Sequence, residues 1–315
     1  MLAGILPFTL ALVMIRVLWF RTLLLLYLVY CFLDPSPQNG RGHGKRLSPQ
    51  AHEWIRSNYG FGCVARFFPI RLHKTADLDP KQAYILCYHP HGVISMGAIT
   101  ALCTNGCGFN EVFPGLRRFG ITLNVTFVVP LFREWLLAQG FISSNKATLT
   151  RELQAGNSLV LIAGGATEAL LAHPDLMSLV GQNRRGFCKL AVENGAQLVP
   201  CLGFGENKAF QTFVPDPVDT GAVGRWLVTI QRTAMKIMQF SMPIMTHPLP
   251  TKTSIDVVVG KPIAALDEPP CDAAVDNDAW DPVEDLHRRY WQAVVDLYDE
   301  NKVRFGYESI PLTLL

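Results

Sequence analysis

Five short apolar runs constrain the fold of this 315-residue chain more than any other feature. They cover residues 83–88, 124–129, 158–163, 198–204 and 255–259, and the last four stop directly before a glycine or a proline. The runs are continuously apolar rather than alternating between apolar and polar residues. Such runs are typical of strands that are buried on both faces of a parallel sheet.

Helical signals separate these runs. Residues 148–155 and 185–194 are each followed by a glycine, which often ends a helix. Later in the chain, Asp281 comes directly before Pro282 and three residues before Glu284, a pattern that opens helices. Strands that alternate with helices predict an α/β fold with a mostly parallel central sheet flanked by helices.

The N-terminal segment is apolar over a length that suits a membrane. The charged residues of segment 2–33 are Arg16 and Arg21. They divide it into the apolar parts 2–15 and 22–33. A spanning helix needs about 20 apolar residues, so neither half reaches that length and the whole exceeds it. We expect residues 1–33 to be a membrane anchor, either a helical hairpin or a single span with an interfacial piece.

Two other interpretations of this segment are weaker. A secretory signal peptide would have a basic start and a cleavage site of small residues, and the segment has neither. A helix in the core of a soluble domain is the third interpretation. The turn-rich residues 34–47 then form a predicted linker. The basic residues near its end indicate the cytoplasmic side of a membrane. Residues 48–315 form the predicted folded domain, with 267–281 as a surface loop.

The composition excludes some classes of partner. Apolar residues make up 49% of the chain and charged residues only 17%, below the roughly 25% of soluble domains, which favours contact with lipid. The net charge of +2, without a long basic run, gives no reason to expect a nucleic-acid partner. The eight cysteines form no C-x-x-C pair, so we expect no zinc module and a reduced, cytosol-facing domain.

The first candidate site is the sequence His89-Pro90-His91-Gly92. It follows a predicted buried strand, where open α/β sheets place their ligands. The proline stiffens the turn, and histidine titrates near neutral pH, so it can take a proton and return it. A turn whose histidines only satisfy backbone groups is an equally simple interpretation. A metal site lacks a second cluster of ligands, and we predict no metal.

Two further segments contain groups that suit chemistry. A strand runs into Gly164 and Gly165, where exposed backbone N–H groups can hold an oxyanion, and Glu168 follows. A carboxylate of this kind can orient a histidine. Arg184 and Arg185 precede a predicted helix and suit a ligand that carries phosphate. The simpler alternatives are a tight turn and a pair of solvated arginines.

A fourth segment contains a strand with Pro200 in it, followed by Phe204, Glu206 and Asn207. A kinked strand of this kind either shapes a pocket or forms the edge of a sheet. Glu206 is a second candidate acid or a structural cap. The chain lacks the nucleophile elbow G-x-S-x-G, the phosphate loop G-x-x-x-x-G-K and the zinc motif H-E-x-x-H.

Together these motifs resemble the type-two diacylglycerol acyltransferase family, which also contains monoacylglycerol and wax alcohol acyltransferases. Eight motifs occur in order, and the resemblance covers the chain from about residue 17 to 306. They lie at 68–72, 88–92, 113–115, 164–168, 185–187, 198–200, 204–207 and 259–263, and their sequences are FPIRL, YHPHG, FPG, GGATE, RGF, LVP, FGEN and VGKPI.

The resemblance implies an N-terminal hairpin in the endoplasmic reticulum membrane and a catalytic domain that faces the cytosol and rests on the bilayer. It implies acyl-CoA and diacylglycerol as substrates and no cofactor, with lipid droplets as a second location. Relatives of the family carry His-x-x-x-x-Asp. Here Ile94 and Met96 stand at the positions of that acid, so Glu168 becomes the expected partner of the base His91. His89 is the alternative base.

The same resemblance assigns roles to the other candidates. Arg184 and Arg185 are expected to bind the phosphates of coenzyme A, and Gly164 and Gly165 to hold the oxyanion. The expected substrate pocket consists of Pro90, Gly92, Phe204, Glu206 and Asn207.

The chain departs from the family in residues 242–250, where it has a short proline-rich link. This departure leaves monoacylglycerol or a long-chain alcohol open as acceptor. It also leaves open an inactive lipid-droplet protein that binds lipid. A homo-oligomer is compatible with the sequence.

Overall fold

The computed structural model describes residues 17–39, 48–213, 221–238, 243–247, 249–266 and 280–315. Helices and strands alternate along most of this length. In chain order they are α2 Leu18–Leu33, α3 Ser36–Asn39, α4 Pro49–Arg56, α5 Tyr59–Phe67, β1 Ile70–Lys74, β2 Tyr84–His89, η1 Ala98–Cys103, α6 Phe109–Val112, β3 Arg118–Thr122, η2 Asn124–Val128, α7 Phe132–Ala138, β4 Phe141–Ser143, α8 Lys146–Gln154, β5 Ser158–Ile162, α9 Gly165–Leu170, β6 Met177–Leu179, α10 Gly186–Asn194, β7 Gln197–Phe204, η3 Glu206–Lys208, β8 Thr212–Phe213, α11 Gly221–Met238, β9 Ile244–Met245, β10 Ile255–Val259, α12 Pro282–Asn301 and β11 Leu312–Leu314.

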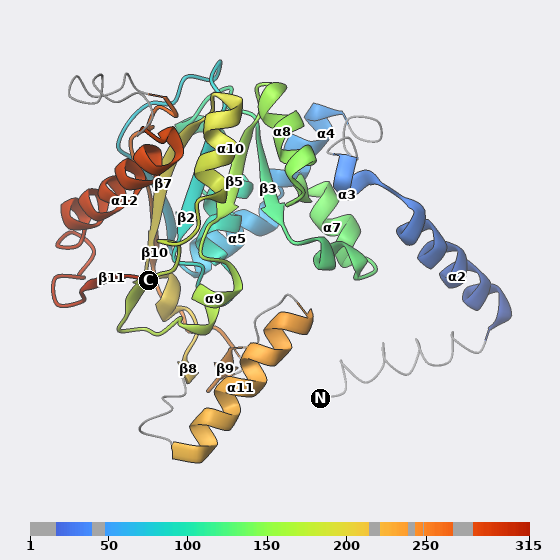
Figure 1. Ribbon diagram of the computed structural model, residues 1–315. Coiled ribbons are helices and arrows are strands. Elements are labelled where there is room, and N and C mark those ends of the chain that lie inside the picture. Colours follow the sequence, from blue (N-terminus) through green and yellow to red (C-terminus); the bar gives the residue numbers. More distant parts are fainter. Residues whose placement is uncertain (1–16, 40–47, 214–220, 239–242, 248, 267–279) are drawn as a thin grey trace.

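A seven-stranded sheet forms the centre of the molecule, with strand order β1-β10-β7-β2-β5-β3-β4 (Figure 1). Strands β7, β2, β5, β3 and β4 run parallel to one another. The pairing of β10 with β7 is antiparallel, and β1 follows β10 in parallel. The predicted α/β fold with a mostly parallel central sheet is therefore confirmed.

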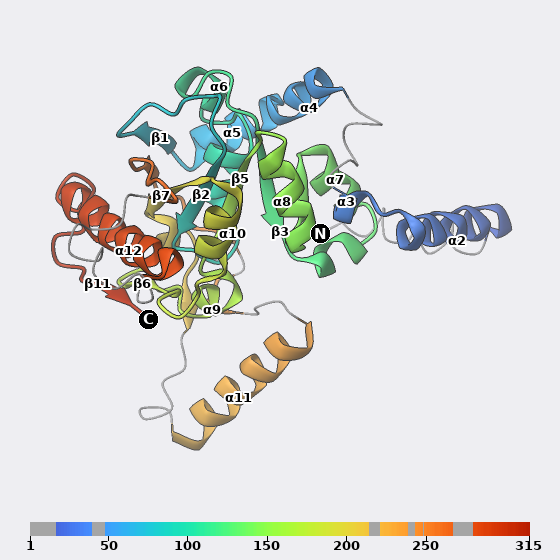
Figure 2. The same cartoon turned by 45° about the horizontal axis from the view of Figure 1, so that its top comes forward.

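Apolar side chains cover both faces of this sheet, as the continuously apolar strands require. On one face, side chains of β2, β5 and β7 pack against α8, α10 and α12, with Tyr290 and Leu190 among the buried residues. On the other face, the alternate residues of the same strands pack against α5, η1 and α6. Figures 1 and 2 show α10 and α12 side by side on the first face.

The predicted boundaries agree closely with four of the five strands. The runs at 83–88, 158–163, 198–204 and 255–259 correspond to β2, β5, β7 and β10. The helix signals also agree: the Asp281 side chain accepts a hydrogen bond from the backbone N–H of Val283 at the start of α12. Gly195 ends α10 in the left-handed conformation, with φ of 63°.

The predicted strand at 124–129 is wrong, because the structure forms a 3₁₀ helix, η2, there. The hydroxyl and the N–H of Thr126 both donate to the carbonyl oxygen of Leu123, which closes a tight turn. Val128 is 73% exposed, so the β-branched residues of this run do not belong to the core. The strand β3 lies just before it, and its residues Arg118 and Gly120 gave no apolar pattern.

Parts of the N-terminal and loop predictions lie outside the described residues. This applies to residues 1–16, which include the first half of the expected hairpin, and to most of the predicted linker and of the 267–281 loop. The second half is the single helix α2, which continues through Arg21. Among the residues that the structure describes, none of the helices has the length and apolar character needed to cross a membrane.

Candidate active site

The candidate site lies at the edge of the sheet where the parallel strands end. His89 is the last residue of β2, and Tyr88 pairs with Ile162 of β5 and with Cys201 of β7. Because β5 and β7 flank β2 in parallel, the turns after all three strands meet at this edge. The predicted motifs, which are far apart in the sequence, are thereby brought together.

Glu168 connects the turn after β5 to the turn after β2. Its carboxylate is fully buried and lies 3.1 Å from Nδ1 of His89, whose side chain is also buried. The same carboxylate accepts hydrogen bonds from the backbone N–H of His91 at 2.6 Å and of Val180 at 2.8 Å. A buried carboxylate needs such donors to offset its lost hydration. The result is a rigid His89–Glu168 pair under the turn.

The expected contact between the Glu168 carboxylate and the ring of His91 is therefore wrong. Glu168 holds the backbone of His91, and its side-chain partner is His89. The physical reason is the direction of the side chains. The last residue of β2 directs its ring toward the side where Glu168 lies, whereas His91 is already part of the turn.

The ring of His91 is oriented by its own turn. Its Nδ1 lies 2.9 Å from the carbonyl oxygen of Gly92 and 3.3 Å from the hydroxyl oxygen of Ser95. A carbonyl oxygen only accepts, so in the neutral ring the proton is on Nδ1 and a lone pair is left on Nε2. The ring is thus set up to accept a proton at Nε2.

Burial is the main influence on the charge of His91. It lowers the pKa of His91 from its ordinary value, against the hydrogen bond to Gly92 and the attraction of Glu168, which both raise the pKa. The ring is therefore neutral at pH 7. The two histidines also differ in access: His91 is partly exposed, whereas His89 is fully buried and its Nε2 has no hydrogen-bond partner among the described residues.

Glu206 supports the turn from the side of β7. Its buried carboxylate accepts hydrogen bonds from the hydroxyl of Tyr88 at 2.6 Å and from the backbone N–H groups of Met96 and Gly97 at 2.7 and 2.8 Å. Burial raises the pKa of Glu206 to about 7, although all three donors lower it. Gly92 is required here, because its φ is 57° and a Cβ would lie 2.7 Å from Cγ of Glu206.

The two glycines after β5 make room for these contacts. A Cβ at Gly164 would lie 2.0 Å from the carboxyl carbon of Glu168, so only glycine lets that side chain fold back over the turn. Gly165 has φ of 54° and begins α9. Arg184 donates to the carbonyl oxygens of Ala163 and Gly164, both at 3.0 Å. The arginine thus ties down the glycine turn.

The remaining predicted residues have structural partners. Arg185 forms an ion pair with Glu284 at the start of α12, on the surface. Phe204 is buried against Tyr298 and Tyr307, so it belongs to the core and not to the expected pocket wall. Asn207 is buried and donates to the carbonyl oxygen of Leu176 at 2.9 Å. Pro90 is buried within the turn, joined to His89 by a cis peptide bond.

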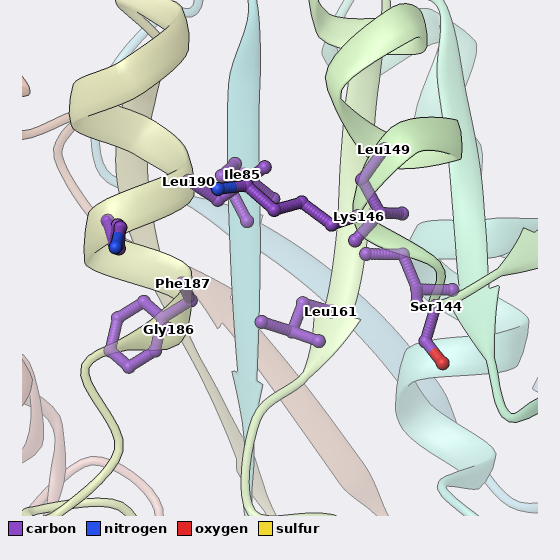
Figure 3. Close-up of a pocket in the computed structure, with 10 residues that line it drawn as sticks. Ile85, Ser144, Lys146, Leu149, Leu161, Gly186, Phe187 and Leu190 are labelled. Atoms are coloured by element: carbon purple, nitrogen blue, oxygen red, sulfur yellow. The ribbon is translucent and has the colours of Figure 1, made fainter.

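A groove of about 490 Å³ lies on the sheet face that is covered by α8 and α10 (Figure 3). Its floor is apolar, and its volume is in the usual range of ligand pockets. Lys146 and Lys189 are its charged lining residues. The lining residues are Ile85, Ile121, Ser144, Lys146, Leu149, Leu161, Gly186, Phe187, Lys189 and Leu190. Ile85 lies four residues before His89 on the same face of β2, a distance of about 13 Å.

Sequence reasoning missed several residues that complete the site. Ser95 approaches the His91 ring, and its hydroxyl also donates to the carbonyl oxygen of His91 at 2.8 Å. Trp291 of α12 packs on the His89 ring with centroids 5.4 Å apart. The spacing of Ser95 four residues after His91 was a usable signal, but no local pattern connects β2 with Trp291.

Fold and site together define an α/β protein with a partly exposed histidine on the turn after a parallel strand and a buried histidine–carboxylate pair beneath that turn. The family model described as diacylglycerol acyltransferase matches residues 11–314. The chain belongs to this diacylglycerol acyltransferase family, as the motifs predicted.

Similar proteins cover nearly the whole chain. The diacylglycerol O-acyltransferase 2A of Umbelopsis ramanniana is 36% identical over 306 residues, which are 93% of this chain and 80% of that protein. The 2-acylglycerol O-acyltransferase 1 of Bos taurus is 36% identical over 301 residues, 91% of this chain and 83% of that protein. A solved 1-acyl-sn-glycerophosphate acyltransferase from Thermotoga maritima aligns with 86% of this chain and 87% of its own, at 10% identity and a TM-score of 0.45.

Proposed function

We propose that this protein is an acyl-CoA-dependent O-acyltransferase that transfers a fatty acyl group to diacylglycerol and forms triacylglycerol. Membership of the family and the names of the relatives support an acylglycerol as acceptor. The proposed mechanism rests on the exposure and the protonation of the His91 ring. It is a partly exposed, neutral imidazole whose Nδ1 is occupied and whose Nε2 is left to accept a proton.

The reaction then follows from the position of this ring. Nε2 of His91 removes the proton of the acceptor hydroxyl, and the oxygen attacks the thioester carbonyl carbon of acyl-CoA. The tetrahedral intermediate collapses with cleavage of the carbon–sulfur bond, and the proton on His91 passes to the departing thiolate. General-base assistance of this kind contributes roughly 10²–10⁴-fold in rate. No cofactor takes part.

Backbone N–H groups are the proposed stabilisers of the oxyanion. The first turn of a helix has N–H groups without acceptors within the helix, and α9 begins at Gly165, directly beside the site. Its orientation is fixed by Arg184 and by the folded-back Glu168. Preorganised donors of this type stabilise a developing negative charge because they need no rearrangement during the reaction.

His89 and Glu168 are proposed as positioning residues. Both side chains are buried, and Glu168 also holds the backbone N–H of His91. A proton acceptor has to reach the substrate hydroxyl, and the burial of Nε2 in His89 withholds it from any lipid in this structure. The pair therefore fixes the turn that presents His91.

The groove on the α8–α10 face is the proposed site of the acyl chain of acyl-CoA. Its apolar floor suits a hydrocarbon chain, and the exposed Lys189 beside it suits phosphate. Lys146 also lines the groove, but its ammonium group forms an ion pair with Glu193. Arg184 and Arg185 are less suited to phosphate than the sequence suggested, because both guanidinium groups already have partners.

Residues 1–33 are proposed as the membrane anchor, in the endoplasmic reticulum with the catalytic domain in the cytosol, and lipid droplets are proposed as a second location. The described part of this segment supports lipid contact. Phe32 of α2 is 90% exposed and Leu33 is 70% exposed. Trp19, Leu23, Leu25 and Leu26 of the same helix are exposed as well. A group of exposed apolar side chains of this size marks a surface that contacts lipid or another protein.

The deciding experiment supplies the purified full-length protein with labelled acyl-CoA and one acceptor at a time. The acceptors are diacylglycerol, monoacylglycerol and a long-chain alcohol, and His91→Ala is the control for each. We expect triacylglycerol as the main product and its loss in the variant. Preference for monoacylglycerol or the alcohol would replace the proposed acceptor. Absence of transfer to all three, with normal lipid-droplet targeting, would instead support a lipid-binding protein without catalysis.

A further inference from the structure

Helix α11 has an apolar stripe that the described structure leaves uncovered. Both views show this 18-residue helix standing clear of the helices that cover the sheet (Figures 1 and 2). Trp226 is 64% exposed and Ile230, one turn later, is 44% exposed. Residues four apart lie on the same side of a helix, so these two side chains form one exposed apolar stripe.

The charged residues in the sequence of this helix have one sign of charge. Its sequence contains three Arg or Lys residues and no Asp or Glu. Arg225, Thr229 and Thr233 are exposed and lie beside the apolar stripe. A basic polar side next to an apolar stripe with tryptophan is typical of a helix that lies in the surface of a bilayer with anionic lipid.

The position of α11 in the chain connects it to the catalytic edge of the sheet. Strand β7 is parallel to β2, so its carboxyl end lies at the edge where His89 lies. The chain continues from there into β8, α11 and β9, and β8 pairs with β9. Thr212 of β8 donates to the carbonyl oxygen of Ala172, just after α9. The two short strands that come before and after α11 in the chain therefore lie close to the candidate active site.

The second helix with many exposed apolar residues, α2, is attached at the same edge. The Tyr27 hydroxyl binds the Glu134 carboxylate and accepts from the backbone N–H of Leu131 at 2.9 Å. Both residues lie at the start of α7, which follows β3 and η2, and β3 is parallel to β5. Leu131 itself is 75% exposed. Two separate apolar projections thus border one edge of the sheet.

We propose that α11 lies in the lipid–water interface and is a second membrane contact, in addition to the N-terminal segment. Trp226 and Ile230 enter the apolar layer, and Arg225 faces lipid phosphates. The helix holds the edge with His91 against the bilayer, so an acylglycerol reaches the base without leaving the membrane. This inference explains how the substrate reaches the active site. Its kinetic consequence rests on the proposed acyltransferase function.

Tryptophan fluorescence tests the position of α11 without any catalysis. The full-length protein is placed in phosphatidylcholine–phosphatidylserine vesicles with and without brominated acyl chains, which quench tryptophan that enters the bilayer. The emission of Trp226 is the difference between the wild type and Trp226→Phe. Trp54→Phe is the matched control, because Trp54 is 76% exposed on α4, at the end of the sheet opposite α11 (Figure 1).

We expect brominated lipid to lower the Trp226 emission at least about twofold, as for a side chain at the membrane interface, and to leave the Trp54 emission unchanged. Unquenched Trp226 would overturn the proposal and would indicate that protein, or a second copy of the chain, covers the stripe. Equal quenching of Trp54 would contradict the proposed orientation of the domain.

A kinetic experiment then tests the consequence for substrate access. Ile230→Glu places a charge in the apolar stripe, and Thr229→Glu places the same charge beside it. In vesicles of phosphatidylcholine that contain diacylglycerol, we expect Ile230→Glu to raise KM on the order of tenfold, because a buried isoleucine side chain is lost from the apolar layer. Thr229→Glu should change KM little, and neither variant should alter kcat.

The two proposals fail in different ways. If Ile230→Glu and Thr229→Glu act alike on an active enzyme, α11 is not the contact. If the wild type transfers no acyl group at all, the proposed function fails, and the fluorescence result still decides where α11 lies.

Discussion

His89 and His91 are separated by a single proline and have the same chemistry, yet the fold treats them in opposite ways. His89 ends a buried strand, pairs with a buried carboxylate and packs under Trp291. His91 lies on the turn, receives its orientation from Gly92 and Ser95, and keeps part of its ring accessible. The comparison teaches that burial and access, more than a carboxylate partner, distinguish the proposed base from its support.

Removal of His91 should have the largest effect on the reaction. We expect His91→Ala to lower kcat by roughly 10²–10⁴-fold, the usual contribution of a general base. Because the ring is partly exposed and its hydrogen-bond partners Gly92 and Ser95 lie in its own turn, the melting temperature should change little. Activity close to that of the wild type would show that His91 is not the base.

Removal of His89 should affect stability and activity together. His89→Ala takes one partner from the fully buried Glu168 carboxylate, which costs about 1–3 kcal/mol of folding free energy. Glu168 also holds the His91 backbone, so a smaller loss of kcat should accompany the lower melting temperature. Denaturant unfolding and kinetics on the same sample check both. A variant with unchanged stability and abolished turnover would exchange the roles of the two histidines.

The groove gives a prediction about acyl-chain length. A Cβ at Gly186 would meet no atom within 4 Å, so Gly186→Leu should fill part of the groove without displacing the backbone. Relative to the wild type, we expect Gly186→Leu to lower kcat/KM several-fold for long acyl chains and to change it little for short ones. The reason is that loss of each buried methylene costs about 0.8 kcal/mol. An equal change for all chain lengths would place the chain elsewhere.

Glu206 should make stability depend on pH. Burial raises its pKa to about 7 in the folded protein, above its ordinary value of 4.5. The folded state then binds more protons than the unfolded state between these values, so this contribution to stability is present at pH 4.5 and is lost as the pH rises through 7. Thermal melts between pH 5 and 8 check this. Glu206→Gln should remove that slope, and a slope that persists would contradict the assignment.

The sequence predicted the parts of the fold that depend on continuous burial or on a cap. Strands β2, β5, β7 and β10 and the start of α12 at Asp281 were found in this way. The prediction for 124–129 was wrong. β-branched residues favour strands, but here the hydrogen bonds of Thr126 close a 3₁₀ turn on the surface. Strand β3 was not predicted, because Arg118 and Gly120 interrupt the continuous apolar pattern by which the other strands were found.

The sequence predicted the titratable residues at the centre of the candidate site but not how they pair. His89, His91, Glu168 and Glu206 all gather at one edge because parallel strands end there. Which histidine meets Glu168 depends on the direction of side chains at the end of β2, and this depends on the register of three strands that are far apart in the sequence. Local sequence contains no information on that register.

Chemical rescue tests the central claim most directly, since access is what separates the two histidines. Imidazole in solution has an open path to the space left by a partly exposed ring, whereas the protein must open before imidazole reaches the space left by a buried one. We predict that imidazole restores a measurable part of the acyl transfer lost in His91→Ala and restores none in His89→Ala. Rescue of His89→Ala alone would contradict the account and would identify the buried histidine as the base.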